Sequence, residues 1–485
     1  MKLKKIINLS IISFLILLLG LLFNYSVNKK EKLNKVESQF KEVLDEFNLI
    51  KSENASLNNK LIVLEGELSL LNLNKEIEIS KNFVKTNYHN LLISSVNISS
   101  LTKDWKSTLT SSGFINNFDN KILFISGLGE IALIDNLNFQ TLNVKSNLNE
   151  IVELQDYPRG TYSIKDTFID GKNIYVSMLS KQSPDDINED CYTFEIFYSN
   201  LSQSFDDLNF TSFVKLPECI PKGLMNGHIT GGRIEKLDDT KLLLSVGDFN
   251  FRNDFPGFLA QDPNSFFGKI LTIDQTSKEI EIFSMGHRNP QGLFVDYNGN
   301  IFETEHGPKG GDEINLITEG NNYGWASVSY GTPMTYFGLN QDTFAYYGTH
   351  KGDHQNYSEP LYSFVPSIGI SQLIRLPEKS SFYNWNNDLI LASMKKGVIF
   401  RIRLSKSLDR VITIEPIINL KKRTRDILLS DNGKSIFLLN EDPSITKIEL
   451  YENIVDTNDS IPFGELFNPF QKINQDPYEI ILEKQ

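Results

Sequence analysis

The chain opens with a nearly continuous apolar stretch, residues 6–23, in which only Asn8, Ser10 and Ser13 are polar. As a helix, this stretch rises about 27 Å, which is close to the hydrocarbon thickness of a bilayer. The lysines ahead of it favour a cytoplasmic N-terminus. We therefore predict a transmembrane anchor within residues 1–28, with the rest of the chain periplasmic or extracellular. A cleaved signal peptide is the alternative, although no small-x-small cleavage site follows.

A repeat of seven residues follows the apolar stretch. Its core positions are apolar except at Asn54, and charged or small polar residues fill the positions between them. This pattern predicts a coiled-coil stalk over 29–85, and an Asn at a core position favours a parallel homodimer. A helix packed on its own globular domain is the alternative. The core positions are Leu33, Val36, Phe40, Val43, Phe47, Ile50, Asn54, Leu57, Leu61, Leu64, Leu68 and Leu71.

From about residue 95 to 455 the pattern changes to short apolar strands, each preceded by a polar turn. Turns rich in Asp, Asn and Gly that lead directly into such strands are typical of β-hairpins. Six copies, roughly 45 to 90 residues apart, predict an all-β fold, a six-bladed β-propeller. A stacked sandwich is the alternative, and residues 456–485 are assigned to a C-terminal tail. The turns lie at 118–120, 169–171, 237–239, 297–299, 385–387 and 431–433.

Composition narrows the range of partners. The net charge of −13 excludes nucleic acid, because phosphates need a basic surface. The only cysteines, Cys191 and Cys219, are too few for a disulfide scaffold and lack the spacing of a zinc site. One disulfide and two free thiols both remain open.

The densest cluster of charge, Gly and Pro lies at residues 286–331. There Gly307-Pro308 precedes a pair of glycines, in a turn whose carbonyls can point outward, and Asp312 and Glu313 add oxygen ligands suited to calcium. An ordinary loop is the alternative.

Two cationic groups follow this cluster in the chain. One is Lys395-Lys396, directly after an apolar strand. The other is Arg423 and Arg425, which fall on one face of a strand because side chains alternate along it. Two arginines on one face suit a carboxylate-rich ligand. A solvated strand edge is the alternative.

The cluster at residues 286–331 and the two cationic groups that follow it, in this order, resemble the glucose/sorbosone dehydrogenase family. This family contains soluble PQQ-dependent glucose dehydrogenases and aldose sugar dehydrogenases. The resemblance covers residues 220 to 445 well, the earlier blades loosely, and the anchor and stalk not at all. It implies oxidation of an aldose or related sugar with pyrroloquinoline quinone (PQQ) and Ca2+. The family's quinone contacts carry over to five residues of this chain. They are Arg288, Asn289, Lys395, Arg423 and Arg425.

The resemblance also assigns the metal ligands and the catalytic base. The backbone carbonyls of Gly307 and Pro308 would hold the calcium that touches the quinone, and Glu313 and Tyr323 would hold a structural calcium. His228 would take the hydroxyl proton of the sugar while hydride passes to the quinone.

Three departures from the family pattern bear on activity. Gly227 stands where the soluble glucose enzymes have an aspartate before the base, and the gap from His228 to Arg233 is one residue longer. The segment around Tyr162 replaces one that supplies a glutamine near the cofactor. A non-catalytic propeller, serving as a carbohydrate- or protein-binding module, is therefore the alternative function.

An enzyme of this class must also pass its electrons on. The sequence has no C-x-x-C-H motif for haem attachment. We therefore expect a separate electron acceptor, either a quinone or a cytochrome.

Overall fold

The computed structural model describes only part of the chain. The described residues are 79–101, 113–136, 138–155, 164–183, 190–201, 208–223, 227–249, 259–331, 356–395 and 397–451, with the isolated residues 41 and 354. The predicted anchor (1–28), nearly all of the predicted stalk (29–85) and the predicted tail (456–485) lie outside them. No described helix is both long and apolar enough to cross a bilayer.

The described strands form six antiparallel sheets of four or five strands. The first three sheets contain β3 (Gly113–Phe118), β4 (Lys121–Ser126), β5 (Ile131–Asp135) and β6 (Thr141–Val144); β7 (Ile164–Asp170), β8 (Asn173–Gln182), β9 (Cys191–Asn200), β10 (Thr211–Lys215) and β11 (Ile220–Pro221); and β12 (Gly231–Lys236), β13 (Lys241–Val246), β14 (Lys269–Asp274) and β15 (Ile280–Met285). The other three contain β16 (Pro290–Val295), β17 (Ile301–Glu305), β18 (Asp312–Ile317) and β19 (Tyr362–Phe364); β20 (Ile370–Arg375), β21 (Leu389–Ser393), β22 (Val398–Leu404) and β23 (Val411–Asn419); and β24 (Thr424–Leu429), β25 (Ser435–Asn440), β26 (Ser444–Leu450), β2 (Asn90–Asn97) and β1 (Ser80–Lys85). Among the described residues the helices are α3 (Leu148–Glu153) and the 3-10 turns η1 (Ser99–Leu101), η2 (Leu259–Gln261) and η4 (Tyr383–Trp385).

The six sheets are arranged as the blades of a propeller. The first strand of each blade, β3, β7, β12, β16, β20 or β24, contacts the first strand of the next blade, and β24 contacts β3. These inner strands therefore form a closed ring around a central axis. The prediction of an all-β, six-bladed propeller is confirmed, and the stacked sandwich is excluded.

All six predicted polar turns join an inner strand to the second strand of its blade. Several of them need a residue in the left-handed region, for instance Asn120 with φ 59° and Gly433 with φ 66°. Asn and Gly adopt this conformation at the least cost, which explains their presence in the turns.

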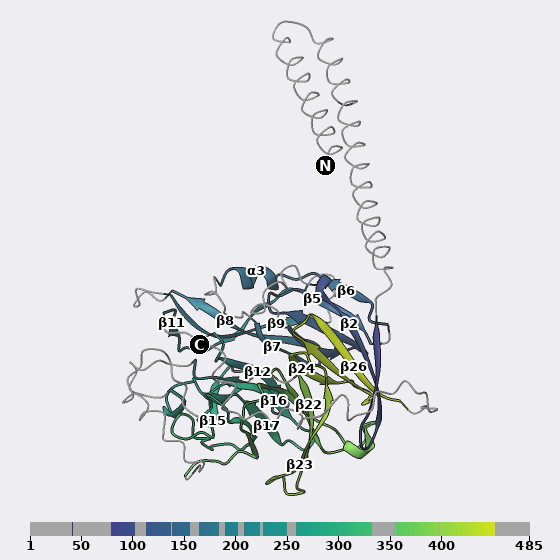
Figure 1. The fold of residues 1–485 in the computed structure, drawn as a ribbon. Helices are drawn as coiled ribbons and strands as arrows, with labels where there is room; N and C mark the ends of the chain where they lie inside the picture. Colours follow the sequence, from purple (N-terminus) through teal and green to yellow (C-terminus); the bar gives the residue numbers. More distant parts are fainter. Residues whose placement is uncertain are drawn as a thin grey trace, which may run out of the picture. The chain divides into compact units, whose positions relative to one another are not determined.

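The last blade joins the two ends of the domain. Strand β2 pairs with β26 over seven residues, and β1 pairs with β2. In Figure 1 the dark blue β2 lies beside the yellow β26. The propeller therefore begins at Ser80 and not near residue 95, and residues 80–85 belong to a blade and not to the stalk.

Apolar side chains fill the space between blades. The buried residues form one large cluster at each of the six blade-to-blade interfaces. Phe124 of β4 and Phe437 of β25, both fully buried, belong to the cluster that joins the last blade to the first. Burying such a side chain contributes roughly 1.5–3 kcal/mol, so all six interfaces hold the ring closed.

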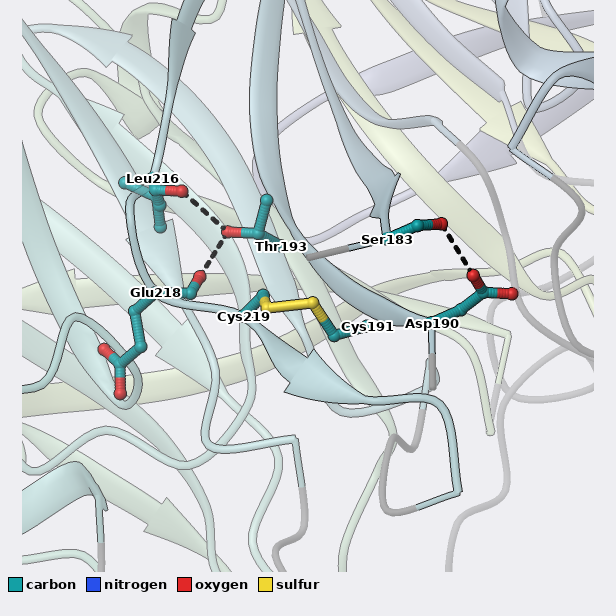
Figure 2. The surroundings of a disulfide bond; sticks show 7 residues. All are labelled: Ser183, Asp190, Cys191, Thr193, Leu216, Glu218 and Cys219. Atoms are coloured by element: carbon teal, nitrogen blue, oxygen red, sulfur yellow. Dashed lines mark hydrogen bonds between the residues drawn. A yellow bond between two sulfur atoms is a disulfide. The ribbon is translucent and has the colours of Figure 1, made fainter. Parts of the chain in front are cut away.

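Cys191 and Cys219 form a disulfide, with their Cα atoms 5.6 Å apart (Figure 2). Thr193 donates a hydrogen bond of 3.2 Å to the Leu216 carbonyl on the same segment (Figure 2). The disulfide fastens the segment that follows β10 to the start of β9. It therefore holds one end of the connection that leads to the loop before β12.

Candidate functional site

A pocket lies at the end of the ring where the inner strands begin. Five of the six inner strands each contribute one or two of their first three residues to its wall, and the loop before β12 adds the rest. Because these strands converge on the axis, side chains far apart in the sequence meet there. The lining residues are Phe114, Ile164, Lys165, Gly227, His228, Thr230, Gly231, Arg233, Pro290, Gln291 and Arg425.

Arg233 ties the inner strands together at this pocket. Its Nη1 donates to Asp166 Oδ1 at 3.0 Å and to Asp426 Oδ1 at 2.9 Å, and its Nε donates to the Gln291 carbonyl at 2.8 Å. The other oxygen of Asp166 accepts from the Ile234 amide at 2.8 Å. Burial raises the pKa of Asp166 to about 7, although Arg233 acts to lower it. A buried network of this kind is costly to break, because removing one partner leaves another charge unpaired.

His228 lies in the loop just before β12. The residue is exposed to solvent. Even so, partial burial, followed by the charges of Lys165 and Arg425, lowers the pKa of its imidazole. A lowered pKa keeps the ring neutral near pH 7, which is the form that accepts a proton.

Lys165, the second residue of β7, shares the pocket wall with His228. Its side chain is nearly buried, and its Nζ donates to the Gly227 carbonyl at 2.8 Å. Burial, with a smaller contribution from Arg425, lowers the pKa of Lys165 to about 7. The lysine therefore fixes the peptide directly before His228 and places a titratable ammonium group beside it.

Arg288 and Asn289 lie in the turn that leads into β16. Arg288 Nη1 donates to the carbonyls of His306 at 2.8 Å and Gly307 at 3.1 Å, and its guanidinium lies 5.3 Å from the Trp325 ring centre. Asn289 Nδ2 donates to the His228 carbonyl at 3.3 Å. Asn289 therefore adjoins the pocket, whereas the guanidinium of Arg288 contacts the Gly-Pro turn.

Arg423 and Arg425 both form ion pairs with Glu441. Although burial acts to raise it, the two arginines lower the pKa of Glu441, so the carboxylate stays ionised at neutral pH. Arg425 is the more buried and lines the pocket, while the side chain of Arg423 is 54% exposed. Lys395, in the loop after β21, is exposed. Of these three cations, Arg425 alone lines the pocket.

Two of the four candidate calcium ligands, Gly307 and Tyr323, are engaged within the protein. The Gly307 carbonyl accepts from Arg288, and the Tyr323 hydroxyl donates to the Leu316 carbonyl at 2.6 Å. Burial raises the pKa of Tyr323 to about 12, so its phenol stays protonated. Asp312, predicted as an oxygen ligand, accepts instead from the backbone amides of residues 368, 369 and 370 through Oδ2. This oxygen shapes that turn, while Asp312 Oδ1 is buried and has no hydrogen-bond partner among the described residues, so its role as a metal ligand stays a prediction.

Comparison with known families decides the identity of the domain. The model of the glucose/sorbosone dehydrogenase family matches residues 160–447, more than half of the chain. The chain belongs to this family. The match covers the second to fifth blades, most of β24–β26 in the last blade, and every pocket residue except Phe114.

Among curated proteins, this family member is similar to quinoprotein glucose dehydrogenase B of Acinetobacter calcoaceticus, with 27% identity over 39% of this chain and 47% of that protein. It is also similar to the aldose sugar dehydrogenase YliI of Escherichia coli, with 28% identity over 50% of this chain and 65% of that protein. The chain therefore spans about half to two thirds of these relatives.

Solved structures share the fold of this glucose/sorbosone dehydrogenase family member. A glucose dehydrogenase structure has a TM-score of 0.57 at 20% identity and covers 72% of this chain and 99% of its own. The apo form of the soluble aldose sugar dehydrogenase of Escherichia coli has a TM-score of 0.56 at 18% identity and covers 74% of this chain and 100% of its own.

Several residues in or beside the pocket of this family member were not predicted from the sequence. Lys165 and Asp166 lie near the start of β7, and Glu441 follows β25. The available signal was a Lys-Asp pair at the start of an apolar strand, where two charges in a core position need partners. Their partners, Gly227 and Arg233, lie in or next to another inner strand, β12, which the closed ring brings beside β7.

Proposed function

We propose that this domain oxidises an aldose or a related sugar, with PQQ as the hydride acceptor, in the pocket beside His228. The observation that carries the proposal is the make-up of this pocket, where a neutral imidazole shares the wall with Lys165 and Arg425. A sugar hydroxyl needs a proton acceptor, and a quinone with three carboxylates needs cations. Membership in the family supports both assignments.

The pocket residues fit PQQ. Its carboxylates lose hydration on binding, and cations with suitable geometry must replace that hydration. Lys165 and Arg425 would meet carboxylates in the pocket, with Asn289 beside them, while Arg423 and Lys395 would act from the rim. When bound, the quinone would accept two electrons from the sugar.

Two of the four residues proposed for calcium, Gly307 and Tyr323, fit less well. The Gly307 carbonyl already accepts from Arg288, and the Tyr323 hydroxyl is bonded to the Leu316 carbonyl. Calcium prefers six to eight oxygen ligands, and a carbonyl already bonded to a guanidinium is a poor one. We therefore assign no step of the mechanism to calcium.

The residues of the chain account for the proton side of the reaction. Oxidation of a sugar CH–OH to C=O removes a proton from the hydroxyl and a hydride from the carbon. The neutral imidazole of His228 accepts that proton on a ring nitrogen. Lys165 holds the Gly227 carbonyl and so fixes the backbone that carries the imidazole.

Titration of PQQ into the full-length chain tests the cofactor assignment. Arg425→Met should raise the Kd by about 30- to 1,000-fold, because a ligand carboxylate loses a cation partner worth roughly 2–4 kcal/mol. Arg410→Met, which removes an exposed arginine after β22, is the matched control and should leave the Kd unchanged. If neither the parent nor the control binds PQQ, the non-catalytic binding module becomes the better account.

A further inference from the structure

A second polar cluster lies inside the fourth blade, away from the pocket. Glu303 and Glu305 are alternate residues of β17 and so share one face, opposite Asn315 and Glu313 of β18. His287, from the segment before β16, covers this face. Ligand atoms of His287, Glu303 and Glu305 all lie within 4.8 Å of one another, and each residue is at most 4% exposed.

One atom of each of these three side chains is held by the protein. Glu305 Oε2 accepts from the Arg288 amide at 2.6 Å, and Glu303 Oε2 accepts from Asn315 Nδ2 at 3.0 Å. His287 Nε2 lies 2.8 Å from Ser284 Oγ. The second atom of each side chain is thereby aimed at the same point. Metal-binding side chains are oriented by such hydrogen bonds.

Two of the three atoms aimed at this point lack partners, whereas Glu305 Oε1 accepts a long hydrogen bond of 3.4 Å from Asn315 Nδ2. Glu303 Oε1 and His287 Nδ1 are buried and have no hydrogen-bond partner in the described part of the chain. His287 Nδ1 lies 3.8 Å from Glu305 Oε1, too far for a hydrogen bond. Burial and then Glu305 raise the pKa of Glu303 well above its usual range. An unpaired buried carboxyl is costly, and a cation would remove the cost.

We propose that His287 Nδ1, Glu303 Oε1 and Glu305 Oε1 bind one divalent transition-metal ion of the zinc or manganese class. Two carboxylates neutralise its charge, and the imidazole ligand favours such an ion over calcium, which prefers oxygen. Ligands about 2.1 Å from a tetrahedral ion lie about 3.4 Å apart, so the 3.8 Å separation needs only a small contraction.

The ion would stabilise the turn of the fourth blade that carries Asn289 to the pocket. Glu305 is also the acceptor for the amides of Arg288, at 2.6 Å, and Asn289, at 3.3 Å. A metal on Glu305 therefore fixes the turn that presents Asn289 to the pocket. The site uses none of the residues proposed for calcium or for PQQ.

Metal analysis of the full-length chain, purified in detergent and dialysed, tests the site. We expect about one equivalent of zinc or manganese, and a rise in the unfolding midpoint when either ion is added back after chelation. Glu303→Gln keeps the shape and removes one ligand charge, so bound metal should fall at least tenfold. Glu235→Gln, which alters a carboxyl outside the cluster, should retain the metal.

Two results would overturn the proposal. If the parent holds no zinc or manganese and its unfolding midpoint ignores both ions, Glu303 is simply protonated. In that case Glu303→Gln should be as stable as the parent or more so, without any response to metal. If calcium alone binds and survives Glu303→Gln, the ligands lie elsewhere in the chain.

Discussion

Lys165 places an ammonium group against the backbone that carries His228. It is nearly buried, donates to the Gly227 carbonyl at 2.8 Å, and has a pKa lowered to about 7, mainly by burial. At pH 8 the free protein therefore holds this lysine mostly neutral. A carboxylate ligand in the same pocket would favour the charged form and raise its pKa.

This predicts proton uptake when PQQ binds. At pH 8 the parent should take up close to one proton, measured by calorimetry in buffers of different ionisation enthalpy. Lys165→Met should lose most of this uptake and bind PQQ more weakly. Equal uptake by the parent and the variant would show that Lys165 does not meet the ligand.

The same shift sets the pH dependence of stability without ligand. Between pH 7 and about 10 the unfolded lysine stays protonated while the folded one is neutral, so the unfolded state binds more protons. The stability of the parent relative to Lys165→Met should therefore rise with pH across this range. Denaturant unfolding at pH 7 and pH 9.5 measures the difference.

At the residue scale, the sequence predicted which residues lie at the pocket better than it predicted which side chains contact one another. His228 and Arg425 do line one pocket, and Asn289 adjoins it. Arg288 faces the Gly-Pro turn, and Glu441 holds both Arg423 and Arg425. These partners come from different blades or strands, so no local pattern identifies them.

At the scale of elements, β2 closes the ring of blades. Leu91 of β2 is fully buried in the cluster between the fifth and sixth blades, whereas its neighbour Leu92 points to the other face and is half-buried. Leu91→Ala should lower the free energy of unfolding by about 2–5 kcal/mol, and Leu92→Ala by clearly less. Equal small effects in denaturant unfolding would mean that β2 is not part of the core.

The six hairpins could be predicted because each is local. An Asx or Gly turn and the strand that follows it are encoded within about ten residues. The closure by β1 and β2 could not, because β2 pairs with β26, more than 300 residues later, and β1 directly follows the heptad region. The disulfide likewise depends on how β9 and β11 pair.

At the scale of the whole molecule, the chain joins a propeller of the glucose/sorbosone dehydrogenase family to a predicted membrane anchor and stalk. We propose that the propeller faces the periplasm or the exterior and passes its electrons to a separate quinone or cytochrome. The Cys191–Cys219 disulfide supports this location, because disulfides persist in oxidising compartments. The anchor at 1–28 and the dimeric coiled coil over residues 33–71 of the stalk stay predictions.

The central claim is that the pocket binds PQQ and that His228 then accepts the sugar proton. The most direct test is dye reduction by the full-length chain with PQQ and a panel of aldoses, alongside His228→Ala. The parent should oxidise at least one aldose only when PQQ is present. His228→Ala should bind PQQ with nearly the same Kd and lose at least about a hundredfold in rate. A parent that binds PQQ but oxidises no aldose, or a His228→Ala variant as fast as the parent, would contradict the account.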